Sequence, residues 1–410
     1  MGQHFSNINI DFACNVSFII FKKMIVGSLT EDRNFEQRIA ITPEIIKKYK
    51  NLGFDIVLSK GYGNHLGIND KEFSDQGVNI LNSSEEVISK SDLILQHNIL
   101  NQQNLKAMKE GQTLIGVLDS YKNEEQLKNL AKNNINFFSL ELLPRITRAQ
   151  SMDILSSHAN LAGYKAVVDS FAFFKKAVPM MMTAAGTISA ARVLVVGAGV
   201  AGLQAIATAK RLGAVVYASD VRKSAAEQIE SVGGRFIEVD GMDDFEDESG
   251  YAKPLTPEFI QKVNDTVCSV AADADIVITT ARIFGRPAPI TVPSSAVESF
   301  KSGAVIVDMN ADVGGNCENT KPGEIYTTDN GVIIVGTSNL PGTIANTASM
   351  LYSNNLTTFI TSLVNEILSI NLISSFKFSD NSLILALISF SKCSPLKSKK
   401  GKKNTVLTPF

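Results

Sequence analysis

The stretch "VLVVGAGVAGLQAIATAKRLGAVVYASDVR", residues 193–222, contains two apolar runs separated by a glycine-rich turn and a helix-length segment, and its second run ends at Asp220. Short apolar runs bounded by glycine are typical of buried strands in parallel sheets. A strand, a Gly-x-Gly-x-x-Gly turn and a helix, in this order, open the βαβ units that bind dinucleotides. The stretch therefore predicts a dinucleotide-binding α/β domain.

Each glycine of this turn has its own steric task. Gly197 permits the tight turn, Gly199 lets a pyrophosphate approach the backbone, and Gly202 lets the helix pack closely on the strand. The free N–H groups at the helix start would face the phosphates. Asp220 could accept hydrogen bonds from both ribose hydroxyls and repel the 2′-phosphate of NADP(H), whereas Arg222 adds a positive charge beside it. The alternative is a glycine turn that serves packing alone.

Composition limits the class of protein. The chain has 410 residues, 44% of them hydrophobic and 20% charged, which is enough for two or three domains with their own cores. The 39 basic and 41 acidic residues give a net charge of -2, which argues against a nucleic-acid partner. The four cysteines have neither metal-ligand spacing nor the density of a disulfide scaffold, so we expect a reducing compartment and no metal site.

Apolar runs and helical segments alternate along most of the chain, which predicts an α/β fold of two Rossmann-like domains with parallel sheets, joined by long helices. We place the first domain at residues 24–160 plus 343–370 and the nucleotide-binding domain at 161–342. The helical pattern of residues 151–178 would link them. The expected strands are IVGSL, FDIVLS, VNIL, DLILQ and TLIGVL in the first domain, and RVLVVG, AVVYASD, RFIEVD, DIVITTA, AVIVDM and VIIVG in the second.

The two ends differ from the middle. Residues 1–23 form an extension that we expect to be disordered; they make a poor signal peptide, and Met24 is an alternative start. Residues 371–410 are an atypical tail in which the apolar run 381–390 is about half the length that a membrane span needs. A frayed tail is the favoured interpretation, and a membrane anchor is the alternative.

A further set of motifs resembles one family closely. It comprises PRITRAQSMDILSSHANLAGYKAV (144–167), TAAGT (183–187), the glycine turn, GYAKPLTPEF (250–259), VDMNADVGGNC (307–317) and PGEIYTTDNGV (322–332). Over residues 24–365 the chain resembles the NAD-binding subunits of proton-translocating nicotinamide nucleotide transhydrogenases. The resemblance implies a homodimer that holds NAD(H) in the cleft between its domains. It also implies that hydride passes directly to NADP(H) held by a separate β subunit.

The resemblance also implies the site residues. The group around the nicotinamide would comprise Arg145, Gln150, Asp153, Ser156 and Tyr251. Contacts to the rest of the cofactor would come from Gly197, Gly199, Val200, Gly202, Asp220, Val221, Arg222, Gly250, Thr280 and Arg282. Hydride transfer between two nicotinamides exchanges no proton, so the protein needs to supply position, orientation and exclusion of water. The acidic segment 240–259 would be a lid, or else a plain surface loop.

The same resemblance implies the surroundings of the protein. We expect a cytoplasmic subunit, peripheral on the inner face of a bacterial plasma membrane, which meets the membrane only through a partner membrane subunit. The homodimer, the NADP-binding β subunit and the membrane subunit are thus the expected partners.

Two other functions stay open. An alanine dehydrogenase needs a carboxylate-binding arginine and general acid/base groups. Arg38 matches the arginine, but Gln96, His97 and Asp119 stand where the related dehydrogenases have lysine and histidine segments, and Asp312 matches only their aspartate. His97 is either a substitute base or, as we favour, a surface histidine. A protein that holds NAD without catalysis is the third possibility.

Overall fold

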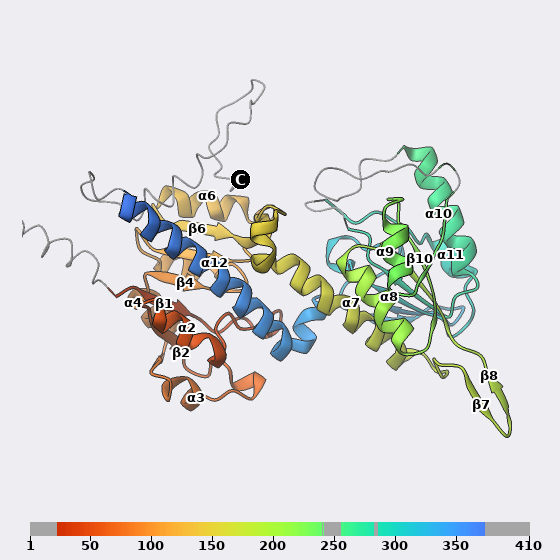
Figure 1. The fold of residues 1–410 in the computed structure, drawn as a ribbon, viewed down its shortest axis with the longest axis horizontal. Coiled ribbons are helices and arrows are strands. Elements are labelled where there is room, and N and C mark those ends of the chain that lie inside the picture. Colours follow the sequence, from red (N-terminus) through yellow and green to blue (C-terminus); the bar gives the residue numbers. More distant parts are fainter. Residues whose placement is uncertain (1–22, 240, 242–255, 283–285, 374–410) are drawn as a thin grey trace, which may run out of the picture. The chain divides into compact units, whose positions relative to one another are not determined.

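The computed structural model describes residues 23–239, 241, 256–282 and 286–373, with side chains described up to residue 365 (Figure 1). The chain divides into two compact units. Unit 1 contains residues 1–153 and 349–410, and unit 2 contains residues 154–348. The boundaries fall at the start of helix α7 (Ile154–Phe173) and within helix α12 (Ala345–Ile373).

Unit 1 is built on a six-stranded parallel sheet with strand order β3-β2-β1-β4-β5-β6. Its strands are β1 (Ile25–Ser28), β2 (Asp55–Ser59), β3 (Asn79–Leu81), β4 (Leu93–Leu95), β5 (Thr113–Gly116) and β6 (Asn136–Ser139). Its other helices are α2 (Ile46–Asn51), α3 (Asp70–Ser74), α4 (Ser84–Lys90), α5 (Gln102–Ala107) and α6 (Glu124–Lys132). The central strands β1, β4 and β5 are mostly apolar and almost entirely buried because helices cover both faces of such a sheet.

Strand β6 was missing from the sequence prediction. It pairs with β5 at the edge of the sheet, and its residues Asn136, Phe137 and Phe138 are only half-buried. An edge strand needs no continuous run of fully buried aliphatic residues, so its pattern is weak in the sequence.

Helix α12 returns the chain to unit 1 through hydrogen bonds that span more than 250 residues of sequence. The backbone N–H groups of Ile39 and Thr42 donate to the hydroxyls of Ser349 (2.9 Å) and Ser353 (3.2 Å). The buried Tyr352 hydroxyl donates to the carbonyl of Gln96, 2.5 Å away at the end of β4. These buried polar contacts fix the position of α12 on the first half of the unit.

Unit 2 contains a seven-stranded sheet with strand order β11-β10-β9-β12-β13-β15-β14, parallel except for the antiparallel edge strand β14. Its strands are β9 (Arg192–Val196), β10 (Val215–Ser219), β11 (Arg235–Phe236), β12 (Ile276–Thr279), β13 (Val305–Asp308), β14 (Ile325–Thr327) and β15 (Ile333–Val335). Its helices besides α7 are α8 (Val200–Arg211), α9 (Ala225–Ser231), α10 (Pro257–Ala271) and α11 (Ser294–Glu298). The strand order reverses at β9, as in doubly wound nucleotide-binding sheets, so the predicted fold class is confirmed.

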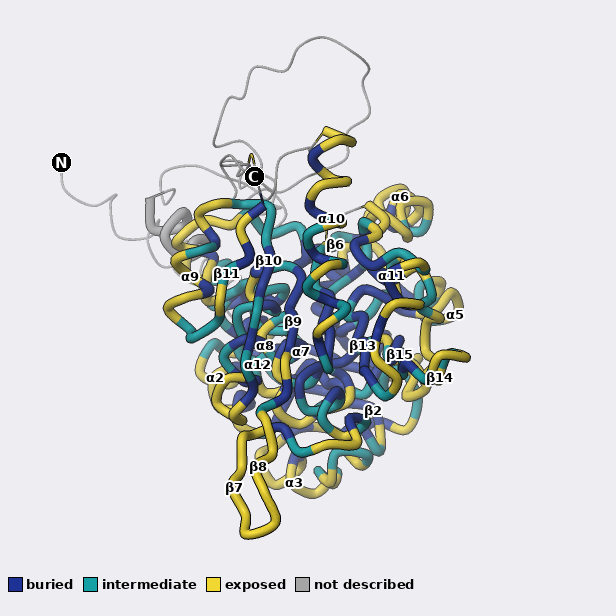
Figure 2. Tube along the Cα trace, turned by 90° about the vertical axis from the view of Figure 1, so that its right-hand side faces the viewer, coloured by how far each residue is buried: buried dark blue, intermediate teal, exposed yellow. Residues whose placement is uncertain are grey.

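The segment between α7 and β9 forms a hairpin of β7 (Met181–Thr183) and β8 (Gly186–Ile188), which the sequence analysis did not predict as strands. Figure 2 shows the hairpin as exposed along its whole length. Among the described helices, none is long and apolar enough to cross a membrane.

Helices α7 and α8 of unit 2 touch at their backbones. A Cβ atom on Gly163 of α7 would lie 2.1 Å from the carbonyl oxygen of Ala201 in α8. No other residue fits without moving one helix, because real Cβ contacts are far longer and the opposing atom belongs to the backbone. Gly163 therefore sets the spacing between α7 and the first turn of α8.

We expect Gly163→Ala to lower the free energy of unfolding by about 1–3 kcal/mol, since the added methyl group overpacks this contact. The sign is informative because alanine in place of a solvent-exposed helix glycine would stabilise the helix by about 1 kcal/mol. Chemical denaturation measures the change. Glu227→Ala, at an exposed position of helix α9, serves as the control, and an unchanged or higher stability of Gly163→Ala would contradict the close contact.

Candidate functional site

The glycine turn between β9 and α8 has the geometry that its sequence predicts. Gly197 has a φ of 97°, in the left-handed region that favours glycine. A Cβ atom on Gly202 would lie 1.9 Å from the carbonyl oxygen of Gly197, so only glycine permits this approach of helix to strand. Gly199, by contrast, has open space around the position of a Cβ atom. The first and third glycines shape the turn, and the second leaves it accessible.

Thr280, after strand β12, holds the turn from behind. Its hydroxyl donates to the carbonyl of Gly197 at 2.9 Å, and its N–H donates to the carbonyl of Val196 at 2.8 Å. The side chain that the sequence assigned to cofactor binding therefore uses its hydroxyl proton to fix the turn.

The N-terminus of α8 is the accessible end of a helix of 12 residues. Its N-cap residue is Gly199, so no side chain caps the first turn, and Val200 is 36% exposed. The first N–H groups of a helix have no partners within the helix and carry the positive end of its dipole. This end can receive an anionic group such as a pyrophosphate.

Asp220, which follows β10, lies beside the turn, but its carboxylate is already occupied. Oδ2 accepts from the N–H of Ala198 at 2.7 Å and from Nη2 of Arg222 at 3.0 Å. Oδ1 accepts from both the N–H and Nε of Arg222, each at 2.9 Å. The side chain of Val221, between them, packs against the core of unit 2. The turn, Asp220 and Arg222 thus form one hydrogen-bonded group.

A second carboxylate, Asp308 at the end of β13, is fully buried and organises the NADVGGN segment. It accepts five hydrogen bonds, from the hydroxyls of Thr279 and Thr320 and from the N–H groups of Asn310, Asn316 and Cys317, at 2.7–3.1 Å. Asp308 was not predicted as a structural residue from the sequence, where its motif pointed only to a family resemblance. An aspartate that ends a buried strand before Asn and Gly residues was the signal that could have identified it.

The remaining charges of that segment lie at the surface. Asp312, the residue that matches the dehydrogenase aspartate, pairs with Arg282 at 3.8 Å, and both side chains are largely exposed. Such a pair contributes little to stability. Tyr251 and Gly250, assigned to the lid, lie outside the described residues.

The PRITRAQSMD segment (144–153) of unit 1 follows the short 3-10 helix η3 (Leu140–Leu142) and forms a second one, η4 (Thr147–Met152), with Arg145 between the two. Arg145 and Gln150 are exposed, and Asp153 ends η4 half-buried. Ser156 follows in the first turn of α7 and belongs to unit 2. The segment is anchored from α12, because the side chain of Asn355 donates to the carbonyl of Ser151 at 2.8 Å.

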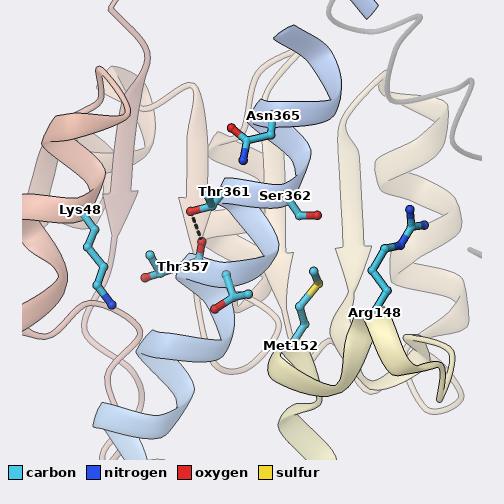
Figure 3. Close-up of a pocket in the computed structure, with 8 residues that line it drawn as sticks. Lys48, Arg148, Met152, Thr357, Thr361, Ser362 and Asn365 are labelled. Carbon is cyan, nitrogen blue, oxygen red and sulfur yellow. Dashed lines mark hydrogen bonds between the residues drawn. The ribbon is translucent and has the colours of Figure 1, made fainter. Parts of the chain in front are cut away.

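Beside this segment, unit 1 has a groove of about 380 Å³ that runs over α12 (Figure 3). Lys48 of α2 and Arg148 of η4 lie on opposite sides of the helix. The hydroxyls of Thr357, Thr358 and Thr361 line its floor and donate to carbonyls of α12 itself. Because the two cations do not converge and these hydroxyl protons are used within the helix, the groove does not form an anion pocket.

A buried polar cluster in unit 1 gathers the residues that bear on the dehydrogenase alternative. The guanidinium of Arg38 donates to both carboxylate oxygens of Glu36 at 2.7 Å. The side-chain oxygen of Gln96 accepts from the N–H of Leu29 at 2.8 Å and from the hydroxyl of Ser28 at 3.1 Å. The Gln96 amide is therefore a structural acceptor that joins β1 to β4.

His97, which we interpreted as a surface histidine, is only 4% exposed, so that interpretation was wrong. The residue follows β4 into the interior, where its Nδ1 lies 3.2 Å from Glu36 and 3.0 Å from the side-chain oxygen of Asn98. Burial, with the positive charge of Arg38, holds the pKa of His97 well below its usual value. The ring is neutral at physiological pH and packs on Tyr352, with ring centroids 4.7 Å apart.

Asp119 stands where the related dehydrogenases have their histidine. It has a φ of 47°, and its exposed carboxylate pairs with Lys122 at 3.0 Å. The two positions that would need acid/base groups thus hold a structural amide and a surface carboxylate. In the described part of the chain, no group of three or more His, Cys, Asp or Glu side chains is arranged to hold a metal ion.

Comparison with known proteins gives the family. Residues 27–162 match the N-terminal domain, and residues 166–383 the C-terminal domain, of a family described as alanine dehydrogenase/PNT. The chain belongs to this family. Membership of this family, together with the similarity of the chain to transhydrogenases, implies NAD(H) binding.

Within the family, the chain is more similar to transhydrogenases than to alanine dehydrogenases. It is 45% identical to an NAD(P) transhydrogenase α subunit of Rhodospirillum rubrum, over 82% of this chain and 89% of that one. The corresponding protein of Rickettsia prowazekii is 42% identical, with the same coverage. An alanine dehydrogenase of Mycolicibacterium smegmatis is 26% identical, over 84% and 88% of the two chains.

Solved structures also match the chain better for a transhydrogenase than for an alanine dehydrogenase. The transhydrogenase of Sinorhizobium meliloti matches 83% of this chain and 94% of its own, with a TM-score of 0.74 and 43% identity. A structure of L-alanine dehydrogenase matches with a TM-score of 0.69 at 20% identity, which shows the shared fold alone. The resemblance that the motifs carried is thus confirmed.

Replacing each of the two aspartates in the NADVGGN region should change the free energy of unfolding by very different amounts. We expect Asp308→Ala to lower the free energy of unfolding by about 3 kcal/mol or more, because five buried donors lose their acceptor. Asp312→Ala removes only a long, exposed ion pair and should change it by less than about 0.5 kcal/mol. Denaturant unfolding of the two variants tests this difference, and equal losses would contradict the structural role of Asp308.

Glu31 gives the buried cluster of unit 1 a measurable pH dependence. Its carboxylate accepts from the N–H of His97 at 2.6 Å, and burial raises its pKa from 4.5 to about 8. Between these values the folded chain keeps a proton that the unfolded chain has lost. The free energy of unfolding contributed by Glu31 therefore falls as pH rises, by at most about 1.4 kcal/mol per pH unit.

We expect Glu31→Gln to remove this dependence, so the stability of the variant relative to the unaltered chain should increase from pH 5 to pH 8. Urea unfolding at several pH values measures the difference, and the exposed Glu44→Gln is the control. Parallel pH profiles of the Glu31→Gln variant and the unaltered chain would refute a raised pKa.

Proposed function

We propose that this chain is the NAD(H)-binding subunit of a proton-translocating NAD(P) transhydrogenase. In this role it presents a bound NADH to NADP⁺ held by a partner β subunit, and hydride passes directly between them. The observation that carries the proposal is the accessible glycine turn of unit 2, in a chain 45% identical to a transhydrogenase α subunit over most of both lengths.

The adenosine and pyrophosphate part of NAD(H) would bind at this turn. The first N–H groups of α8 would receive the pyrophosphate beside Gly199 and Val200, and Asp220 would accept the ribose hydroxyls. Arg282, exposed after β12, is a further candidate for a phosphate contact. Gly197, Gly202 and Thr280 act on the turn rather than on the ligand, because their contacts are with backbone atoms.

The nicotinamide end would be held by the PRITRAQSMD segment and the start of α7. Arg145 can make a charge-assisted contact, while Gln150, Asp153 and Ser156 can fix the carboxamide and ribose and so select one ring face. The nicotinamide itself supplies the hydride chemistry. Tyr251 and Gly250 would belong to a segment that excludes water.

The state of the side chains at the expected acid/base positions favours this function over that of an alanine dehydrogenase. A dehydrogenase of amino acids must move protons as well as hydride. Gln96 cannot titrate, Asp119 pairs with Lys122 at the surface, and a low pKa keeps His97 neutral within the buried cluster. Direct hydride exchange between two nicotinamides needs no acid/base group at these positions. A chain that only holds NAD would show binding without exchange.

The partners and the cellular location follow from the same proposal. The protein would act with an NADP-binding β subunit and a membrane subunit that moves protons. It would lie in the cytoplasm, at the inner face of a bacterial plasma membrane, and meet the bilayer only through those partners.

An activity assay tests the proposal against its alternatives. We expect the purified chain to exchange hydride between NADH and an NADP⁺ analogue only after addition of an NADP-binding transhydrogenase subunit, and Arg145→Ala to lower the rate at least tenfold. Absorbance of the reduced analogue measures the rate. Reduction of pyruvate with NADH and ammonia would establish the dehydrogenase instead, and NADH binding with neither activity would leave a holder of NAD.

The β7–β8 hairpin supports the proposed homodimer. Three apolar side chains on it, and one directly before it, are exposed, namely Met181, Met182 and Ile188, and Met180. A two-stranded hairpin is marginal by itself, and clustered exposed apolar groups mark contact surfaces. The hairpin would therefore pack on a second copy of the chain.

We expect the unaltered chain to sediment as a dimer and Met182→Glu to shift it to monomer, because the contact would then bury an unpaired charge. Analytical ultracentrifugation measures the shift. Asn129→Glu, on the exposed side of α6, is the control. A dimer that survives Met182→Glu would place the contact elsewhere.

A further inference from the structure

The guanidinium of Arg222 covers the carboxylate that the proposed function assigns to the ribose. Two of its nitrogens, Nε and Nη2, donate to the two oxygens of Asp220 at 2.9 and 3.0 Å. Nη2 also donates to the carbonyl of Ala198, inside the glycine turn, at 3.2 Å. Arg222 therefore joins the turn to the end of β10 at the site of the expected ribose contact.

The Asp220 carboxylate has no acceptor capacity left for a ligand in this arrangement. A carboxylate offers about four lone-pair directions, and four donors already use them. Two of these donors are backbone N–H groups, of Ala198 and Arg222, which cannot leave without undoing the turn. The other two belong to one side chain, which can rotate away. Ribose hydroxyls can therefore donate to Asp220 only after the Arg222 guanidinium has moved away from it.

The pair also alters the charge that a nucleotide meets. The side chains of Asp220 and Arg222 are 8% and 14% exposed, so solvent screens them poorly. An unpaired aspartate here would repel a 2′-phosphate strongly. The Asp220–Arg222 pair is neutral overall, so it repels a phosphate less than an unpaired carboxylate would. Arg222 thus reduces the discrimination that Asp220 would exert alone.

We propose that Arg222 is a displaceable counter-ion of Asp220 and that it determines how strongly the turn prefers NADH over NADPH. The inference rests on the proposed function, namely that this turn binds the adenosine half of NAD(H). When NADH binds, its ribose hydroxyls replace the guanidinium as donors to Asp220. When NADPH binds, the guanidinium stays near the 2′-position and offsets the repulsion between the phosphate and Asp220.

Titration of the full-length chain with NADH and with NADPH, followed by nicotinamide fluorescence, tests the proposal. We expect Arg222→Ala to raise the ratio of the NADPH to the NADH dissociation constant by about tenfold, with NADH bound at least as tightly as before. Arg222→Lys keeps the charge and should leave the ratio within about threefold of that of the unaltered chain. Equal weakening of both nucleotides by Arg222→Ala would indicate a purely structural role and overturn the proposal.

A double-mutant cycle separates the counter-ion from a direct phosphate ligand. Asp220→Ala should weaken NADH binding and bring the ratio towards one. In that background Arg222→Ala should change the ratio less than twofold, because there is no carboxylate left whose charge the loss of Arg222 could expose. A large loss of NADPH binding there would show that Arg222 binds the phosphate independently of Asp220, which overturns the proposal.

Thermal unfolding of each variant checks the fold, and Asp220→Asn, which keeps the shape of the side chain, replaces Asp220→Ala in the cycle if the latter does not fold. An unaltered chain that binds neither nucleotide would refute the proposed function itself. A chain that binds NADH, but whose ratio is unmoved by Arg222→Ala, would refute only the role of Arg222.

Discussion

The close approach of the Gly197 carbonyl to the first turn of α8 is the contact on which the nucleotide end of unit 2 depends. The missing Cβ of Gly202 permits it, and the hydroxyl of Thr280 fixes the carbonyl from the other side at 2.9 Å. Gly163 brings α7 onto the carbonyl of Ala201 in the same helix turn. Because the turn, α8 and α7 meet there at glycines and Thr280 adds a hydrogen bond, the N–H groups of α8 keep one position at the open end of the sheet.

In each of the two units, buried polar groups that follow or end strands hold neighbouring segments of the chain. Asp308 holds the NADVGGN segment, Gln96 joins β1 to β4, and Asp220 joins β10 to the turn. A buried carboxylate or amide tolerates such a place only when donors surround it. These residues therefore act first on the chain itself. For Asp220 alone, two of the donors sit on a side chain that can be exchanged for a ligand.

The sequence predicted the parts of the fold that depend on local pattern. The central strands and the glycine turn could be identified because buried parallel strands are continuous apolar runs and the turn needs glycine at fixed spacing. The edge strands β6 and β14 and the β7–β8 hairpin were not predicted, because half-exposed strands carry that pattern only weakly. The prediction that His97 lies at the surface was wrong for another reason. The side chains that bury it, Glu36 and Tyr352, are distant in sequence and meet it only in the folded unit.

The candidate site explains how one fold can serve two chemistries. In the proposed function, nucleotide binding depends on the backbone geometry of the turn. Proton transfer depends on a few side chains at the ends of strands in unit 1, and there this chain has Gln96 bonded to Leu29 and Asp119 paired with Lys122. A chain that lacks the acid/base groups of a dehydrogenase at these strand ends is poorly suited to oxidise an amino acid. It can still pass hydride to a second nicotinamide, because that reaction needs only position and a dry environment.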